Sequence, residues 1–136
     1  MSNAETSQEG SSVKKYETIN ISDVETSADK KLSFTKTFFF EYKSEDGTRL
    51  AGQFTCQRPN LGALGQLGVI KARLNGGEKI HASLDFLHEM LAYCQVTLTE
   101  TPDWWQPADF YDADILRSVY DHVRSWEDSF RKRSVG

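Results

Sequence analysis

The sequence predicts an α+β domain in which an N-terminal β-hairpin packs against a three-helix bundle. Two observations support this fold class. Apolar residues alternate with polar residues on either side of the segment 44–47, as they do in paired, half-buried strands. After Pro59, apolar residues instead recur every three or four positions, which is typical of amphipathic helices.

The composition of the first 30 residues differs from that of the rest of the chain. This segment carries six acidic residues and three lysines, many Ser and Thr residues, and almost no aromatic residues. Such a composition buries too little apolar surface to offset the entropy lost on ordering. We therefore expect residues 1–14 to form a disordered arm and residues 15–31 to form an edge strand or a linker. Residues 32–133 then form a single folded domain.

Two apolar faces joined by a tight turn define the predicted hairpin. Asp46 and Gly47 supply the positive φ that such turns require. The apolar face of the first strand is interrupted only by Lys36 and consists of Leu32, Phe34, Phe38, Phe40 and Tyr42. The return strand places on one face Leu50, Gly52, Phe54 and Cys56.

The first predicted helix runs from Leu61 to about Leu74 and is capped by Asn60. Three glycines cost such a helix roughly 2–3 kcal/mol relative to alanine, so close approach of another backbone is expected there. The helix face is interpreted either as a smooth surface against the sheet or as a contact between subunits. Neither a dinucleotide fingerprint nor a P-loop is present. The three glycines are Gly62, Gly65 and Gly68.

Two further helices complete the predicted bundle. One runs from Leu84 to about Leu98 with Ser83 as its cap, and the other begins after Asp112, or after Asp109 through a short turn. The apolar stripe of the second helix contains Leu84, Leu87, Leu91, Cys94 and Leu98, widened by Phe86, Met90 and Tyr93. The stripe of the third contains Ile115, Leu116, Val119, Val123, Trp126 and Phe130.

Charge and hydropathy argue against two classes of partner. The net charge of −4, from 16 basic and 20 acidic residues, argues against the basic face that nucleic acid requires. The longest apolar runs, such as 38–40, are far too short to span a membrane. We therefore expect a soluble protein that binds neither nucleic acid nor a membrane.

The sequence offers little for catalysis or metal binding. His88 begins like a zinc-protease helix, but Ala92 stands where the second histidine would be. The acidic stretch from Asp103 to Asp114 lacks the glycine and the terminal glutamate of a calcium loop. Cys56 and Cys94 lie in different predicted elements and are expected to be free thiols in a reducing compartment. The sequence thus predicts a protein that is not an enzyme and uses no cofactor or metal ion.

Two adjacent tryptophans form the most distinctive local feature. Trp104 and Trp105 lie between Pro102 and Pro107, which restrict the loop. Tryptophan is enriched at the energetic centres of protein interfaces, but the pair is equally interpreted as a plug for the base of the core. The candidate partner-binding residues are therefore Trp104, Trp105 and the glycine face of Gly62, Gly65 and Gly68. One tryptophan is expected to anchor the loop on the last helix, near Ile115 or Val119.

The order of these segments resembles the tail assembly chaperones, small proteins encoded among the tail genes of tailed bacteriophages. The resemblance covers about residues 33–131. It rests on the hairpin of residues 40–59, the Gly-rich helix ending at residue 77, the apolar helix of residues 90–98, the segment 102–105 and the helix of residues 112–130.

The resemblance implies a non-enzymatic protein of the host cytoplasm that binds the tape measure protein during tail assembly. It would keep that long, aggregation-prone helix soluble and help to recruit tail tube protein subunits, and self-association is expected. The alternative is a structural protein located in the virion, such as a neck, decoration or tail accessory subunit. The expected binding surfaces are the glycine face and the tryptophan loop.

Overall fold

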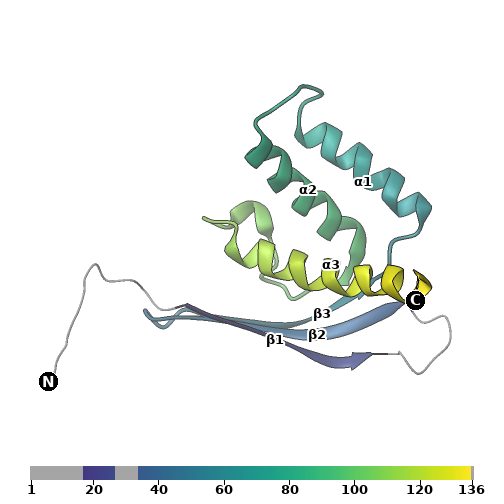
Figure 1. Ribbon diagram of the computed structural model, residues 1–136. Helices are drawn as coiled ribbons and strands as arrows, with labels where there is room; N and C mark the ends of the chain where they lie inside the picture. Colours follow the sequence, from purple (N-terminus) through teal and green to yellow (C-terminus); the bar gives the residue numbers. More distant parts are fainter. Residues whose placement is uncertain (1–16, 27–33, 136) are drawn as a thin grey trace, which may run out of the picture.

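The computed structural model describes residues 17–26 and 34–135, so the predicted arm of residues 1–14 lies outside the described residues. The described chain has a mixed α+β fold. Its antiparallel sheet has four strands in the order β1-β2-β3-β4, and three α-helices lie on one face of that sheet (Figure 1). The strands are β1 (Glu17–Thr26), β2 (Thr35–Ser44), β3 (Arg49–Gln57) and β4 (Leu98–Glu100).

The predicted hairpin forms the centre of this sheet. β2 and β3 pair in antiparallel register from Thr35 opposite Gln57 to Lys43 opposite Arg49. Gly47 has a φ of 96°, as the turn chemistry predicts. The predicted inner faces are confirmed for four side chains that are fully buried: Phe38, Phe40, Phe54 and Cys56. Phe34 is instead 38% exposed, and Leu32 lies outside the described residues.

The sheet extends beyond the hairpin on both sides. β1 pairs with β2 along almost its whole length, with a register shift between Asp23 and Glu25. It lies within the region for which the sequence left an edge strand and a linker as alternatives. β4 pairs with β3 through Leu98 and Glu100. The predicted helix end at about Leu98 is confirmed, since α2 ends at Thr97 and Leu98 caps it, but the sequence did not predict the short strand that follows.

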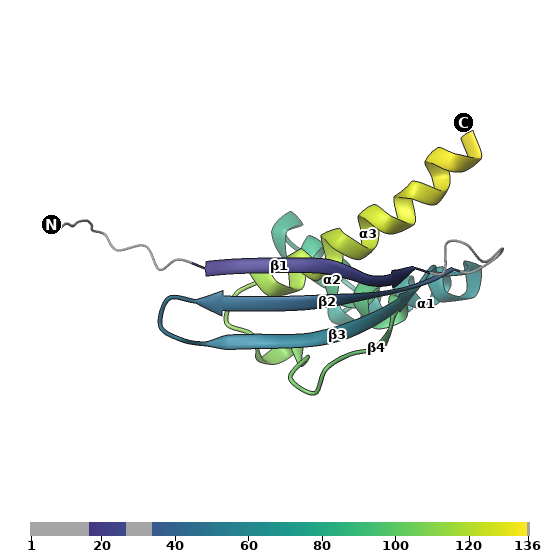
Figure 2. The same ribbon diagram turned by 90° about the horizontal axis from the view of Figure 1, so that it is seen from below.

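The three helices are α1 (Leu61–Leu74), α2 (Ala82–Thr97) and α3 (Asp114–Val135). α3 and α2 cover the inner face of the sheet, while α1 packs on α2 at a distance from the strands (Figure 1). Seen from below, the opposite face of the sheet carries none of the described helices (Figure 2). The helices therefore form successive layers on a four-stranded sheet, rather than a bundle against an isolated hairpin.

The core lies between the sheet and the α2/α3 layer. It joins the phenylalanines of β2 and β3 to Tyr93 of α2 and to Val119 and Val123 of α3. Tyr93 also donates a hydrogen bond from its hydroxyl to Glu127 Oε1 at 2.5 Å. This bond satisfies the Tyr93 hydroxyl donor and one carboxylate oxygen of Glu127, and both side chains are almost completely buried. It ties α2 to α3 across the middle of the core.

The predicted helix starts were partly right. Asn60 caps α1 by accepting a hydrogen bond from the Ala63 amide at 2.8 Å, as expected. α2 is capped by His81, not by Ser83, since His81 Nδ1 accepts a hydrogen bond from the Ser83 amide at 3.1 Å. Before α3, Asp112 Oδ1 accepts from the Asp114 amide at 2.9 Å. None of the described helices is long and apolar enough to cross a membrane.

The glycine face of α1 does not lie against the sheet, so that interpretation was wrong. A Cβ atom added at Gly65 or Gly68 would meet nothing within 4 Å. A Cβ atom at Gly62 would approach only Asn60 Oδ1, at 3.4 Å. Among the described residues, therefore, no close backbone contact explains the glycines of α1.

Candidate functional site: an apolar groove beside the tryptophan loop

The tryptophan loop is fixed on the sheet by Trp104. The indole N–H of Trp104 donates a hydrogen bond to the carbonyl oxygen of Ala51 at 2.9 Å. Its ring centroid lies 5.8 Å from that of Phe40 and 5.9 Å from that of Phe54. The anchor is thus on β2 and β3, whereas the sequence analysis placed it near Ile115 or Val119 of the last helix.

Trp105 lies beside this anchor and also contacts the core. Its ring meets Phe54 edge-on at 5.2 Å between centroids, and Phe110 at 5.6 Å. The short 3₁₀ helix η1 (Pro107–Asp109) follows directly and turns the chain back toward α2. Trp105 and Pro107 thereby form one wall of a groove whose other wall is α2.

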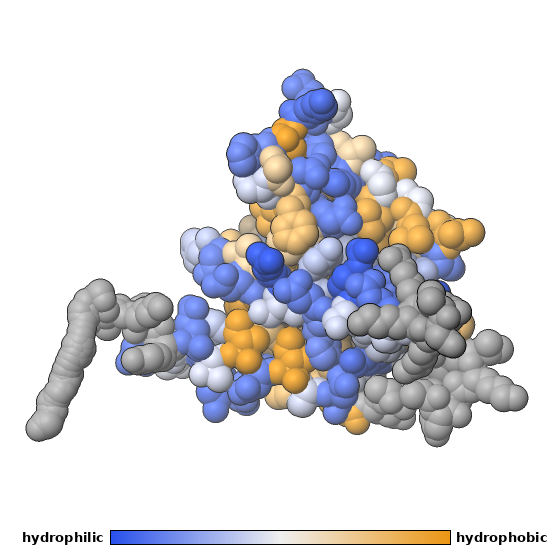
Figure 3. Space-filling view, viewed as in Figure 1, coloured by the Kyte–Doolittle hydropathy of each residue, from blue (hydrophilic) through white to orange (hydrophobic). Residues whose placement is uncertain are grey.

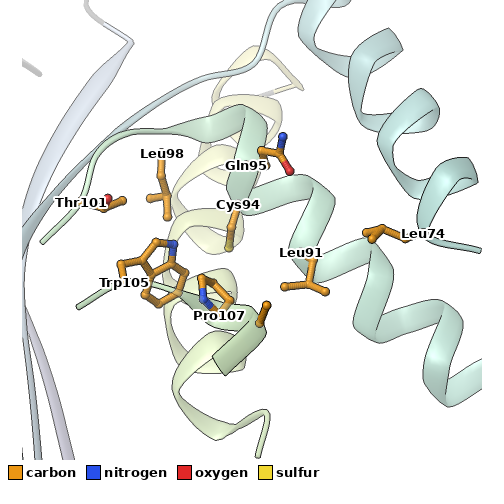
Figure 4. Close-up of a pocket in the computed structure, with 9 residues that line it drawn as sticks. Leu74, Leu91, Cys94, Gln95, Leu98, Thr101, Trp105 and Pro107 are labelled. Carbon is orange, nitrogen blue, oxygen red and sulfur yellow. The ribbon is translucent and has the colours of Figure 1, made fainter. Parts of the chain in front are cut away.

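This groove has a volume of about 410 Å³. Figure 4 shows Trp105 and Pro107 facing Leu91 and Cys94 of α2, with Leu74 of α1 at the far end. Three separate parts of the chain therefore contribute to one apolar surface. The lining residues are Leu74, Leu91, Cys94, Gln95, Leu98, Thr101, Trp105, Pro107 and Ala108.

The rotation of α2 about its axis explains why leucines remain available here. The buried residues of α2 are Met90, Ala92, Tyr93, Cys94 and Thr97, and Met90, Tyr93 and Cys94 belong to the main hydrophobic core. Leu91 of α2 lies to one side of these core residues, and Leu98 follows at the start of β4; both are only partly buried. The helical spacing of both leucines predicted that they belong to the core stripe, and their position at the groove is the main functional feature that this pattern does not reveal.

The chemistry of the groove is that of an apolar binding surface. Gln95 and Thr101 supply the uncharged polar side chains among the residues that line it. Burial raises the pKa of the Cys94 thiol to about 12, so this sulfur stays protonated and weakly nucleophilic at neutral pH. A groove of this kind suits the aliphatic side chains of a partner segment.

The predicted binding residues fall on two separate surfaces. Trp105 lines the groove, whereas the side chain of Trp104 packs against β2 and β3. The three glycines lie on α1. Of the residues of this helix, only Leu74, in its last turn, lines the groove. The structure therefore does not bring the tryptophan pair and the glycine face together.

Polar clusters elsewhere in the described chain connect elements to one another. Lys71 of α1 lies 3.1 Å from Asp85 and 3.2 Å from Glu89 of α2, and Asn75 bonds to Asp85 and to His88. These contacts fasten α1 to α2. The described residues contain no group of three or more His, Cys, Asp and Glu side chains arranged to hold a metal ion.

A second cluster joins β1, β2 and α3. Lys36, although almost completely buried, lies 3.0 Å from Asp23, and His122 Nε2 lies 3.2 Å from the same carboxylate. Burial lowers the pKa of His122, and the charge of Lys36 lowers it further, while the bond to Asp23 opposes both. Burial acts to raise the pKa of Asp23, but the bond and charge of Lys36 outweigh it and lower that pKa.

Together these features define a mixed α+β protein that carries an apolar groove between a helix and an aromatic loop. Comparison of the chain with protein-family models, with curated proteins and with solved structures finds no match.

Proposed function

We propose that this protein is a non-enzymatic tail assembly chaperone that binds an amphipathic helix of the phage tape measure protein. The groove beside Trp105 is the observation that carries the proposal. An amphipathic helix presents apolar side chains at i, i+3, i+4 and i+7, and a groove with leucine and tryptophan walls accepts such anchors. The resemblance of the chain to tail assembly chaperones names the partner.

The charges around the groove support a role in keeping a partner soluble. Asp103 and Asp109 are exposed in the loop and in η1, next to the residues that line the groove. The chain as a whole has a net charge of −4. Like charges on neighbouring complexes repel one another, which opposes aggregation of the bound helix. Recruitment of tail tube protein subunits would follow in the same assembly step.

One feature favours the second candidate, a structural subunit of the virion. In the described part of the chain, β1 pairs with β2 alone, so the backbone groups along its other edge face away from the sheet. An exposed edge strand can pair with a strand of another subunit in a stable assembly. Mass spectrometry of purified virions distinguishes the two candidates, because a chaperone should be absent from the mature particle.

Co-expression with tape measure fragments tests the chaperone proposal. The wild-type protein should keep a helical fragment in the soluble fraction and co-purify with it. Ala108→Glu and Leu74→Asp place charges in the groove at exposed positions and should abolish this effect. Leu84→Asp is the matched control, since Leu84 is 42% exposed, as Leu74 is, but does not line the groove. Retention of the fragment by both groove variants would refute the proposal.

A further inference from the structure

The apolar groove continues past η1 into a second cavity of about 260 Å³. The two cavities share Leu91, Pro107 and Ala108, so η1 forms a wall of both. On its other sides the second cavity is bounded by Leu87 of α2 and by Leu116 near the start of α3. One apolar surface therefore extends along α2 on both sides of η1.

The length of this surface matches two turns of a partner helix. Its α2 wall runs from Leu87 to Gln95, which is about 12 Å of helical rise over eight residues. Apolar anchors at i, i+3, i+4 and i+7 of a partner span about 10 Å. The apolar residues that Figure 3 shows gathered over α1 add little here, because of that helix only Leu74 lines the groove.

The rim of this surface is acidic beside η1. Asp112 lines the second cavity, and Asp109 is exposed between Ala108 and Phe110, which both line it. Asp103 is exposed in the tryptophan loop, and residues 100–114 contain no Lys or Arg. In the described part of the chain, none of these three carboxylates belongs to an ion pair. Their negative charge is therefore not neutralised within the described chain.

The bases of the neighbouring helices do not offset this charge. Lys71 and Arg117 each form ion pairs with carboxylates of α2 and α3. Arg73 is exposed beside Leu74, which lines the first cavity but not the second. The negative potential is therefore concentrated at the η1 end of the apolar surface.

We propose that the helix that occupies this surface is basic. Its apolar anchors fill the two cavities, and Lys or Arg side chains beside those anchors meet Asp109 and Asp112. The aliphatic stems of Lys and Arg can cross apolar surface and bring their charge to the rim. A carboxylate helps only at the rim, because at Ala108, between the cavities, it would be covered and desolvated by the helix. This inference rests on the proposed function, since it takes the groove to be the helix-binding site.

Fluorescence anisotropy with two designed helical peptides tests the charge preference. The peptides share one apolar stripe and differ only at two flanking positions, which hold Lys in one peptide and Glu in the other. At low salt, the wild-type protein should bind the Lys peptide at least about fivefold more tightly than the Glu peptide. The ratio of the two affinities should fall toward one at about 0.5 M salt, because the charges are then screened.

Asp109→Asn combined with Asp112→Asn should reduce this ratio to within about twofold at low salt. Asparagine at position 112 keeps an oxygen that can accept from the Asp114 amide, so α3 should begin as in the wild type. Glu45→Gln combined with Glu78→Gln is the matched control. It also removes two negative charges, but at exposed positions that line neither cavity, and it should keep the wild-type ratio.

Equal affinity of the wild type for both peptides at low salt would overturn the basic partner but leave helix binding by the groove intact. Tighter binding of the Glu peptide, or an unchanged ratio in the variant with both Asp109→Asn and Asp112→Asn, would overturn it as well. Binding of neither peptide would also overturn this inference, and the proposed function would then depend on the tape measure fragments alone. Dimerisation of the free protein that the Lys peptide reverses would assign the groove to a second copy instead.

Discussion

The ring of Pro102 lies directly over Gly52, so that a Cβ atom on Gly52 would come within 2.5 Å of Pro102 Cβ. The glycine thus allows the tryptophan loop to rest on β3. Trp104 makes its hydrogen bond to Ala51, the residue before this glycine. The position of Trp105, and with it one wall of the groove, depends on this close contact.

We predict that Gly52→Ala destabilises the protein by about 1–3 kcal/mol, as overpacking does. The reason is that the added methyl group must displace the Pro102 ring. Urea unfolding gives the change in the free energy of unfolding. Gly65→Ala is the control, because its methyl group enters open space and should stabilise α1 by up to about 1 kcal/mol. Equal effects of the two substitutions would contradict the packing described for the loop.

Trp104 and Trp105 should respond differently to replacement by phenylalanine. Trp104→Phe removes the donor to the Ala51 carbonyl group and should cost about 1–3 kcal/mol through the unsatisfied acceptor and the lost ring contacts. Trp105→Phe should cost less, since its main described interactions are ring contacts with Phe54 and Phe110. Thermal unfolding of the two variants measures the difference. A larger loss for Trp105→Phe would show that the anchor has been assigned to the wrong residue.

Local features of the fold could be predicted from the sequence. The turn at Gly47 and the cap at Asn60 depend on residues close in the chain, and both are confirmed. The i,i+4 spacing in α3 also favours ion pairs, and Arg117 Nε lies 3.7 Å from Asp121 Oδ2 while Arg124 Nε lies 3.5 Å from Asp128 Oδ1.

Features set by distant parts of the chain could not be predicted in this way. β4 exists because residues near Leu98 pair with β3, and an apolar residue at that position fits a helix stripe equally well. The bond from Trp104 to Ala51 joins residues 53 positions apart and leaves no pattern in the sequence. The groove depends on the rotation of α2, which decides whether Leu91 faces the core or the surface.

Stability should fall as the pH decreases below about 6.5, because of His122. Burial and Lys36 lower the pKa of His122 below its ordinary value of 6.5, so the unfolded chain takes up this proton first. The stabilising contribution is therefore complete above pH 6.5 and is lost as the pH falls toward the lowered value. Urea unfolding between about pH 7.5 and pH 5 gives the free energy of unfolding as a function of pH. In His122→Gln, the part of this pH dependence that comes from His122 should be absent. An unchanged pH dependence in the variant would contradict the described environment of His122.

The two cysteines should react slowly with thiol reagents in the native protein. Burial raises the pKa values of Cys56 and Cys94 to about 12, and both side chains are almost fully inaccessible. Only unfolding should expose the thiolate that reacts. The rate of labelling by a chromogenic disulfide should therefore increase with urea in parallel with unfolding. Rapid labelling of Cys94 without unfolding would show that the groove opens more deeply than described.

The central claim is that the groove beside Trp105 binds an amphipathic helix of the tape measure protein. Its most direct test is calorimetric titration of a helical tape measure peptide into the wild-type protein, Ala108→Glu and Leu84→Asp. We predict saturable binding by the wild type and by Leu84→Asp, and affinity at least about tenfold weaker for Ala108→Glu, equivalent to about 1.4 kcal/mol. Equal affinity of all three proteins, or no binding by a folded wild-type protein, would contradict the account.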